Sequence, residues 1–468
     1  MRRHPPRRSF WRRLGRMLLW CLAVLIVLDV TTTIIASYRL KAGLAKVKAE
    51  SAPLTFAEAT PPRIPADQNA ATAYLRVAEM IKPHTYIGKR ELSPTGTGYV
   101  REAGQPLGYG GGDWFSAQDL KGLAGLLKQD ADALELLNRA AALPGCRFDD
   151  DWSEIIPTSM LHLSKLRDVA RFCADATAVA AAQGDAALTA RRLRAGLALS
   201  VHTTRAPTFI SQTVAYACFS VSQRSAEFAL PRCTISASDP RAILALLTGI
   251  DLRANLEEAM QTERARTLSI YGMAHRKPWS VSGDDSEAGM GWAIWTYARA
   301  LPPLFRHDET AYLEYMERTI QATAAQWNDF PRLNQELNDW SRGGLKCTVV
   351  ARIFSADLSE AAVARLCCQT RLNLISASLG LSVYKQRTGQ YPESLSDLAR
   401  INWPVPQDPF STGPLRYQRI GDRYVLYSVG PDGIDDGGKP TWEWRADRSG
   451  PKPKDEDPSK GDLPWQWR

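Results

Sequence analysis

The sequence predicts a mainly α-helical protein with an N-terminal transmembrane helix, an array of α-helical hairpins and a small C-terminal α+β module. Three observations predict this fold class. An uncharged segment follows an arginine-rich start, apolar residues recur at helical spacing through the middle of the chain, and β-prone runs are found near the C-terminus. With 468 residues and 44% hydrophobic content, the chain is long enough for two or three domains with buried cores.

The positive charge of the chain is concentrated at its N-terminus. Residues 1–16 contain seven arginines and no acidic residue, and without these seven the net charge of +8 falls to +1. The remainder of the chain is therefore electrically balanced. Because a nucleic-acid-binding protein normally keeps a basic surface on its folded part, we expect no nucleic-acid partner.

Residues 17–36 are expected to form a transmembrane helix. The run Met17–Leu28 carries no charge, and the whole segment has the length of about 20 residues that a hydrocarbon core requires. Asp29 lies past the midpoint, where its carboxylate can reach the headgroups. Since an arginine excess stays on the cytoplasmic side, residues 1–16 are expected in the cytoplasm and the bulk of the chain outside. This predicts a single-pass protein of the bacterial inner (cytoplasmic) membrane.

A cleaved signal peptide is the alternative interpretation of the same segment. The charged start and the apolar run fit it, but no good small-x-small cleavage site follows, since Ile34 lies two residues before Ala36. Arg7-Arg8-Ser9-Phe10 is similar to a twin-arginine export core, although the strongly apolar segment suits ordinary insertion better. Both interpretations predict export.

The cysteines give no metal or redox motif. The sequence has no C-x-x-C pair and no zinc-ligand spacing. Cys173, Cys218 and Cys367 lie on apolar helical stripes, so we expect them to be small buried residues. An oxidising compartment would permit disulfides, whose pairing the sequence leaves open.

Residues 37–66 are expected to be a linker and residues 67–360 an α-helical domain. Asp67 is expected to cap the first helix of that domain. The glycine-rich stretch 82–113 is expected to be a long loop or small hairpin, and a helix is expected from a Ser116 cap to Ala142.

Three consecutive helices with narrow apolar stripes follow in the middle of the chain. Their stripe residues recur at spacings of three and four, and breaks at Gly184-Asp185 and Pro207 separate the helices. The stripes are Leu166, Ala170, Cys173, Thr177 and Ala180; Ala190, Leu193, Leu197 and Ser200; and Val214, Cys218, Val221, Ser225 and Phe228. Because small residues let helix axes approach closely, we expect stacked antiparallel hairpins. Further helices are expected at 239–271, 292–300 and 310–327.

Residues 361–440 are expected to form the α+β module. A long amphipathic helix at 361–386 ends before Gly389. Two β-prone runs at 415–420 and 423–429 then flank Gly421-Asp422, which suits a two-residue hairpin turn with glycine first. Residues 441–468 are rich in proline, lysine and aspartate and are expected to be a poorly ordered polar tail.

Several short motifs follow one another in this module. They are Tyr384-Lys385, Thr388-Gly389-Gln390-Tyr391-Pro392, Asp408-Pro409-Phe410, Leu415-Arg416-Tyr417 and the run from Tyr424 to Gly433. In this order, residues 361–438 resemble the periplasmic head of the type II secretion major pseudopilin. The resemblance covers under a fifth of the chain and implies one helix packed on a small antiparallel sheet.

The sequence also departs from the pseudopilin pattern. Pseudopilins carry a glutamate five residues after the prepilin cleavage glycine, whereas Gly15 here is followed at that place by Trp20. The resemblance therefore does not imply polymerisation into a pseudopilus. The whole arrangement is similar to a group of uncharacterised bacterial membrane proteins, in which an Asn-Ala-Ala opening (Asn69-Ala70-Ala71) and a His-x-x-x-x-Arg motif (His162 to Arg167) recur.

The pseudopilin resemblance implies a calcium site after the last strand. The matching positions are Ser428, Asp432, Asp435 and Asp436. Calcium takes six to eight oxygen ligands, which clustered carboxylates and backbone carbonyls can supply. The alternative is an ordinary solvated Asp-Gly turn.

No catalytic motif is present in the sequence. It has no G-x-S-x-G, no P-loop and no H-E-x-x-H pair, so no catalytic or organic-cofactor residue is assigned. His162 with Arg167 and Asp168 could form a site, and a capping or interhelix hydrogen bond is the alternative. We therefore expect a membrane-tethered interaction or scaffold protein of the cell envelope with a protein partner. The alternatives are an envelope hydrolase with a non-motif active site and an accessory of a type II secretion-like machine.

Overall fold

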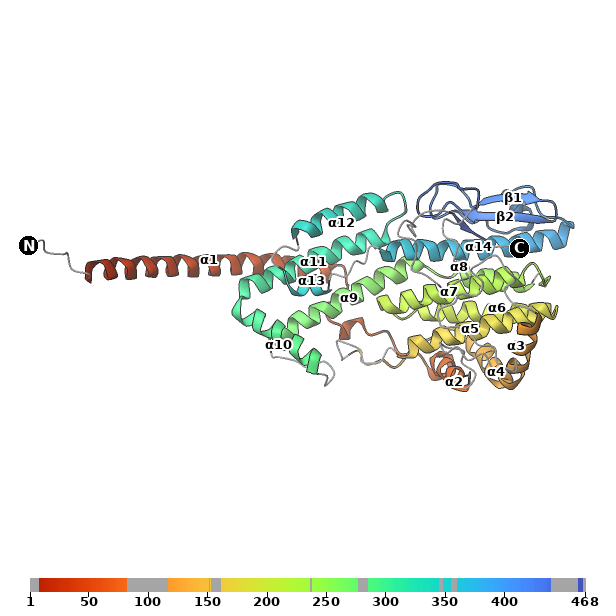
Figure 1. Cartoon of the computed structure of the whole chain (residues 1–468), viewed down its shortest axis with the longest axis horizontal. Coiled ribbons are helices and arrows are strands. Elements are labelled where there is room, and N and C mark those ends of the chain that lie inside the picture. The colour runs from red at the N-terminus through yellow and green to blue at the C-terminus, as the bar shows by residue number, and fades with distance from the viewer. Residues whose placement is uncertain are drawn as a thin grey trace, which may run out of the picture.

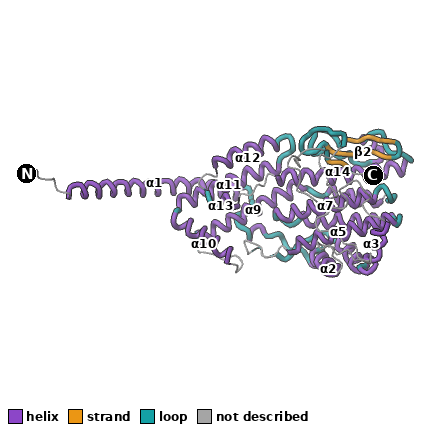
Figure 2. Tube along the Cα trace, in the orientation of Figure 1, coloured by secondary structure: helices purple, strands orange, loops and turns teal. Residues whose placement is uncertain are grey.

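The computed structural model describes residues 8–81, 117–150, 152, 161–235, 238–276, 285–344, 348–354, 360–438 and 462–465. The protein is mainly helical, with one long N-terminal helix that projects from a body of packed helices (Figure 1). A small antiparallel sheet lies at one corner of this body (Figure 2). The coarse fold class is confirmed. The expected loop at 82–113 and the expected Ser116 cap lie outside the described residues.

The N-terminal helix α1 (Arg8–Ala49) does not end at Ala36. Its last part packs against the body, where Leu40 and Val47 are buried together with Leu268 and Leu313. The expected linker at 37–66 is therefore wrong for residues 37–49. The reason is that apolar residues continue at helical spacing beyond the membrane segment, so the helix gains a buried face and goes on.

Residues 50–81 cross the body before the first helix of the array. They include two 3-10 turns, η1 (Ala57–Ala59) and η2 (Ala66–Gln68), and then α2 (Ala71–Ile81). The side chain of Asn69, and not that of Asp67, accepts from the Ala71 amide at 3.1 Å. The expected cap was thus placed two residues too early, because a short 3-10 turn precedes the helix.

Helices α3 (Ala117–Gln129) and α4 (Ala131–Ala141) replace the single helix expected up to Ala142. The hairpins α5 (Leu161–Ala182), α6 (Ala186–Thr204) and α7 (Phe209–Ala229) follow as expected. Asp185 caps α6 by accepting from the Leu188 amide at 2.9 Å, and Gly184 has a φ of +73° at the turn. Most of the predicted stripe residues are buried, while Val214 and Val221 are half-buried.

Six helices then complete the array. They are α8 (Ser238–Thr248), α9 (Leu252–Ala274), α10 (Asp285–Ala300), α11 (Pro302–Ala324), α12 (Phe330–Gly344) and α13 (Val350–Phe354). The stretch expected as one helix at 239–271 is divided, and Asp251 caps α9 at its start. The sequence did not predict α12, because this helix is largely polar and buries only Phe330 and Leu337.

Helix α14 (Glu360–Thr388) lies between the sheet and the helices α7 and α8 and contacts α7, α8 and strand β2 (Arg423–Ser428) (Figure 1). One hydrophobic cluster joins α6, α7, α8 and α14 to the C-terminal residues. Arg365 is buried and donates to the carbonyls of Thr323 and Ala325 at 3.2 and 2.7 Å, which satisfies the C-terminal end of α11. Residues 361–438 therefore share their core with the helical array.

The sheet is small and antiparallel. Strand β1 (Arg416–Ile420) pairs with β2 through a two-residue turn at Gly421-Asp422, and Gly421 has the positive φ of +57° that the sequence predicted for this position. The two-residue strand β3 (Leu463–Pro464) pairs with the end of β2, and Trp465 is buried. The expectation of a poorly ordered tail is thus wrong for residues 462–465, while residues 441–461 lie outside the described residues.

Candidate functional site

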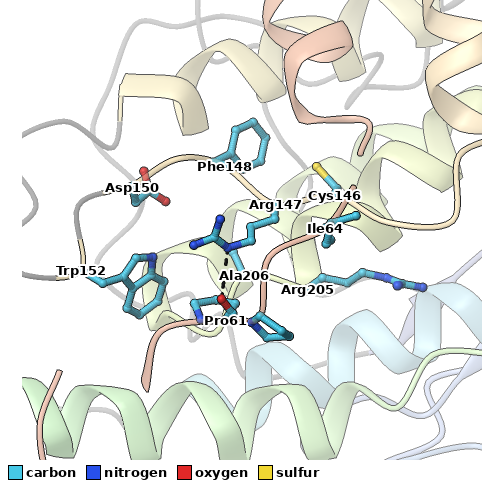
Figure 3. Close-up of a pocket in the computed structure, with 10 residues that line it drawn as sticks. Pro61, Ile64, Cys146, Arg147, Phe148, Asp150, Trp152, Arg205 and Ala206 are labelled. Atoms are coloured by element: carbon cyan, nitrogen blue, oxygen red, sulfur yellow. Dashed lines mark hydrogen bonds between the residues drawn. The ribbon is translucent and has the colours of Figure 1, made fainter. Parts of the chain in front are cut away.

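Three segments that are distant in sequence meet at one small cavity of the body. They are residues 61–64, residues 146–152 and the turn between α6 and α7. The cavity has a volume of about 180 Å³ and is lined mainly by apolar side chains (Figure 3). Its lining residues are Pro61, Pro62, Ile64, Cys146, Arg147, Phe148, Asp150, Trp152, Arg205 and Ala206.

Asn69 positions the segment that carries most of this lining. Its Oδ1 accepts from the Arg147 amide at 2.8 Å, and its Nδ2 donates to the Arg147 carbonyl at 2.8 Å. The Ala70 amide also donates to the Gly145 carbonyl at 2.8 Å. The Asn-Ala-Ala opening noted in the sequence is therefore a structural clamp between α2 and residues 145–147.

Arg147 is tied to the backbone and is not free to bind a ligand with its whole guanidinium group. Its Nε donates to the Pro61 carbonyl at 3.1 Å, the dashed line in Figure 3, and its Nη1 lies 3.5 Å from Asp149 Oδ1. The guanidinium of Arg205 extends away from Arg147 in the same view. Burial raises the pKa of the Cys146 thiol to about 12, so this cysteine is not a thiolate nucleophile.

His162 is part of this region, but its partner is one that the sequence did not indicate. Its Nδ1 lies 3.5 Å from Asp150 Oδ1, and its ring stacks on Phe148 with centroids 4.3 Å apart. Burial raises the pKa of Asp150. Asp168, which the sequence grouped with His162, instead pairs with Arg171 at 3.1 Å. This contact joins the loop that carries Asp150 to α5, so it is neither a contact between two helices nor a pairing of His162 with Asp168.

The volume and the bonding of this cavity favour a structural role. Pockets for small organic ligands usually enclose about 300–1,000 Å³, more than the volume found here. The side-chain amide of Asn69, the Nε of Arg147 and the Nδ1 of His162 all make contacts within the chain. Trp152 stacks on Phe56 at 4.8 Å and closes one side. The cavity is therefore better explained as a gap between packed segments than as a substrate site.

A second, more polar cavity lies at the C-terminal end of α1. It has a volume of about 360 Å³ and is lined by side chains from α9 and α11 and by Glu50. Lys46 of α1 donates to Glu317 at 2.8 Å, and the guanidinium of Arg264 lies 3.8 Å from the other oxygen of Glu317. Arg264 is only 2% exposed, and its Nε and Nη2 have no hydrogen-bond partner among the described residues. This ionic group connects the N-terminal helix to the body.

Glu317 is ionised at neutral pH in this group. Burial by itself would raise its pKa, but the hydrogen bond and the positive charge of Lys46 outweigh burial and lower it. The ion pair of Glu317 with Lys46 is therefore formed at neutral pH. No sequence pattern indicates this ion pair, because 271 residues separate the two side chains.

The structure does not bring the four expected calcium ligands together. Ser428 is buried and donates to Asp408 at 2.6 Å, whereas Asp435 accepts from Tyr427 at 2.8 Å and from Arg416 at 3.2 Å. Asp432 accepts from the Ile434 amide at 3.1 Å, and Asp436 is exposed. Within the described ranges, no group of three or more His, Cys, Asp or Glu side chains is placed to hold a metal ion. Calcium at Ser428, Asp432, Asp435 and Asp436 stays a prediction.

Asp408 is the polar residue that organises this turn. It accepts from Ser428 and from the amides of Phe410 and Val429, both at 3.0 Å, and it is almost fully buried. The only signal for it in the sequence is the Asp408-Pro409-Phe410 motif. Of the three cysteines expected to be buried, Cys173 and Cys218 are buried and free, whereas Cys367 is free but half-buried.

Comparisons of the chain with protein-family models, with curated proteins and with solved structures give no match. The class of protein is therefore defined by the structure itself. Among the described residues, one helix is long and apolar enough to cross a membrane, and it is the Gly15–Ala49 part of α1. The most apolar window of this helix has no residue buried in the body. This fits a helical protein with an N-terminal transmembrane or signal anchor.

Proposed function

We propose that this chain is a membrane-tethered interaction or scaffold protein of the bacterial cell envelope. In this proposal α1 spans the inner membrane, residues 1–16 remain in the cytoplasm and the body lies outside. The observation that carries it is the change of environment along α1: Met17–Leu28 is exposed and apolar, whereas Leu40 and Val47 are buried against the body. An apolar helix surface of this length is stable in lipid and not in water.

The continuity of α1 supports an uncleaved anchor. The helix runs without a break through Ala36, the position considered for signal-peptide cleavage, and its next turns are fixed by the Lys46–Glu317 contact. A scaffold role is supported by the array of hairpins, because packed helical arrays offer extended surfaces to other proteins. The hydrolase alternative has less support, since His162 and Asp150 pair with each other and join a loop to α5.

A second candidate is an accessory of a type II secretion-like machine. What favours it is the order of elements after α14: the 3-10 helix η4 (Leu395–Ile401), the buried Asp408 and the β1–β2 hairpin. This order agrees with the pseudopilin-like module that we propose for residues 361–440. In this candidate the protein partners would be pseudopilus components.

The anchor and its orientation are tested by fractionation and reporter fusions. We expect the full chain to stay in the membrane pellet after alkaline carbonate extraction. We also expect a C-terminal alkaline phosphatase fusion to be active and a C-terminal green fluorescent protein fusion to be dark. A chain found soluble in the cytosol, or the opposite reporter pattern, would contradict the proposal.

The interaction role is tested by photocrosslinking in cells. Ile420 and Ile434 are large apolar residues that are exposed near the sheet, so a photoreactive residue at either position should capture a protein partner. The same residue at Asp339, on the charged surface of α12, serves as the control. The secretion candidate requires a pseudopilus component among the adducts, and the scaffold proposal fails if neither apolar position gives a specific adduct.

A further inference from the structure

Five large apolar side chains are exposed on the helices α10, α11 and α13 or beside them. They are Trp292, Leu301, Leu304, Val349 and Ile353, and each is between 40% and 57% exposed. We call this group the proximal surface. Figure 1 shows α10 at the end of the body from which the free part of α1 emerges. The position of the proximal surface along the axis of α1 can therefore be compared with that of the predicted transmembrane segment.

The packing of α1 on α11 fixes that distance. A Cβ atom added at Gly43 would lie 3.4 Å from Leu313, and Lys46 contacts Glu317 at 2.8 Å, so the two helices run side by side in the same direction. Each helical residue advances about 1.5 Å. Going back by the same number of residues on both helices places Leu304 at the level of Ile34. Ile34 is an exposed residue of the predicted transmembrane segment.

The outer face of α10 has the composition of a lipid-contacting helix. Its exposed positions from residue 289 onward are Gly289, Trp292, Ala293, Thr296, Arg299 and Ala300. Arg299 is the one charged residue between positions 289 and 305, a stretch that the structure describes completely. A helix on a water-exposed surface normally turns a charged and polar face outward. This face is mostly small or apolar, and its largest exposed side chain is a tryptophan.

Val349 and the start of α13 lie near the same level. The amides of Val349 and Val350 donate to Asp308 at 2.6 and 3.0 Å, which places the start of α13 beside the second turn of α11. Counting back by the same number of residues on α1 and α11, from the pair Gly43 and Leu313, places Asp308 level with Tyr38 of α1. Tyr38 is 77% exposed. Tyrosine and tryptophan are the residues that concentrate at membrane–water interfaces.

We propose that the proximal surface inserts into the interface of the same bilayer that α1 spans. The partner is the boundary between headgroups and acyl chains, which accepts aromatic and aliphatic side chains. Arg39 and Lys41 are exposed just beyond the span, where they would meet lipid phosphates. The body would then rest on the membrane in a fixed orientation. This inference depends on the proposed anchoring by α1.

The test measures the depth of single labels in the full-length protein. A cysteine replaces Leu304, Trp292 or, as the matched control, Ile420 in a chain that carries Cys21→Ala. Ile420 is as exposed as Trp292 but lies on β1. Each cysteine receives a nitrobenzoxadiazole label, and the Cys21→Ala parent serves as the labelling blank. The proteins are reconstituted in vesicles of phosphatidylethanolamine and phosphatidylglycerol, with or without brominated acyl chains.

We expect brominated lipid to lower the emission of labels at 304 and 292 by roughly twofold, and to leave the label at 420 unchanged. The natural Cys21, labelled in the wild-type chain, reports on the anchor separately. If Cys21 is quenched but 304 and 292 behave like 420, the inference is overturned and the anchor stands. Labels at 304 and 292 that are shielded from aqueous iodide but not quenched by bromolipid would indicate a protein partner or a second copy, and would also overturn it. An unquenched Cys21 would overturn the anchor together with the inference.

Discussion

At the scale of single residues, buried carboxylates of this protein connect segments that are distant in sequence. Asp308 is fully buried and accepts from the hydroxyl of Tyr271 at 2.7 Å and from the amides of Val349, Val350 and Ala351. It thereby does for α13 what an N-cap residue does within a helix. Such a carboxylate is tolerated in the interior because several donors replace its water.

Asp308→Asn should destabilise the protein by about 2–4 kcal/mol, because an amide keeps one acceptor oxygen and turns an NH₂ group toward backbone N–H donors. Urea unfolding in mild detergent measures the free energy. Hydrogen exchange at Val350 and Ala351 should become faster in the same variant. Asp339→Asn, which removes a carboxylate from the exposed pair with Arg342, is the control and should change little. Equal effects of the two substitutions would contradict this role for Asp308.

His202 makes stability depend on pH. Burial lowers its pKa from 6.5 to about 4, and the positive charge of Arg205 adds to this. Its Nε2–H donates to the Leu143 carbonyl at 3.1 Å, so the hydroxyl of Tyr74 donates to Nδ1 at 2.8 Å and the neutral ring is held in one tautomer. Between pH 6.5 and 4 the unfolded chain binds a proton that the folded chain does not. The free energy of unfolding should therefore fall by about 3 kcal/mol as pH drops through this window.

The contribution of His202 is isolated by substitution. In His202→Gln, the pH dependence of urea unfolding between pH 7 and 4 should be smaller than in the wild-type protein. His307 is an exposed histidine, and His307→Gln should keep the wild-type pH dependence. The assignment fails if the two variants show the same slope of stability against pH.

At the scale of elements, the ring of Trp403 packs directly on Gly380 of α14. A Cβ atom added there would lie 2.6 Å from the ring of Trp403, whose Nε1 donates to the Ser376 carbonyl at 3.0 Å. Gly380→Ala should therefore destabilise the protein by about 1–3 kcal/mol despite the better helix propensity of alanine. Gly272→Ala in α9 meets nothing within 4 Å and should stabilise by about 0.5–1 kcal/mol. Thermal unfolding of both variants checks the contrast, which would be absent if Trp403 could move aside freely.

At the junction of α1 with α9 and α11, two substitutions are expected to change the free energy of unfolding differently. Glu317→Gln should lower the free energy of unfolding by about 1–3 kcal/mol, because it leaves the buried Arg264 without its counter-charge. Arg264→Met replaces a buried cation, two of whose nitrogens lack partners, by an apolar side chain of similar length. It should be neutral or stabilising, and it should reduce the effect of Glu317→Gln in the double variant. A double-mutant cycle by urea unfolding measures this coupling, and strictly additive effects would contradict it.

At the scale of the whole molecule, residues 462–465 pack on the hydrophobic cluster that contains α14. Trp465 is buried, and its amide donates to the Leu426 carbonyl at 2.8 Å. Trp465→Ala should cost about 3–5 kcal/mol of stability in detergent. Trp292→Ala removes an exposed tryptophan and should cost less than about 0.5 kcal/mol under the same conditions. Similar midpoints for the two variants would show that the C-terminal residues do not pack as described.

The sequence by itself determined the apolar N-terminal segment, the three helices α5 to α7 and the β1–β2 turn. These features are local, since hydrophobic periodicity, a cap such as Asp185 and a glycine with positive φ act within a few residues. Of the candidate sites, the sequence singled out Asn69, without a partner, and His162, which it grouped with Arg167 and Asp168.

Only the tertiary structure decided which residues are partners: Arg147 for Asn69, Asp150 for His162 and Glu317 for Lys46. It also decided that α1 continues to Ala49, and that α10 exposes Trp292 together with small residues. The physical reason is that burial and ion pairing depend on which surfaces pack together. That packing joins residues up to 271 positions apart and leaves no periodic pattern in the chain.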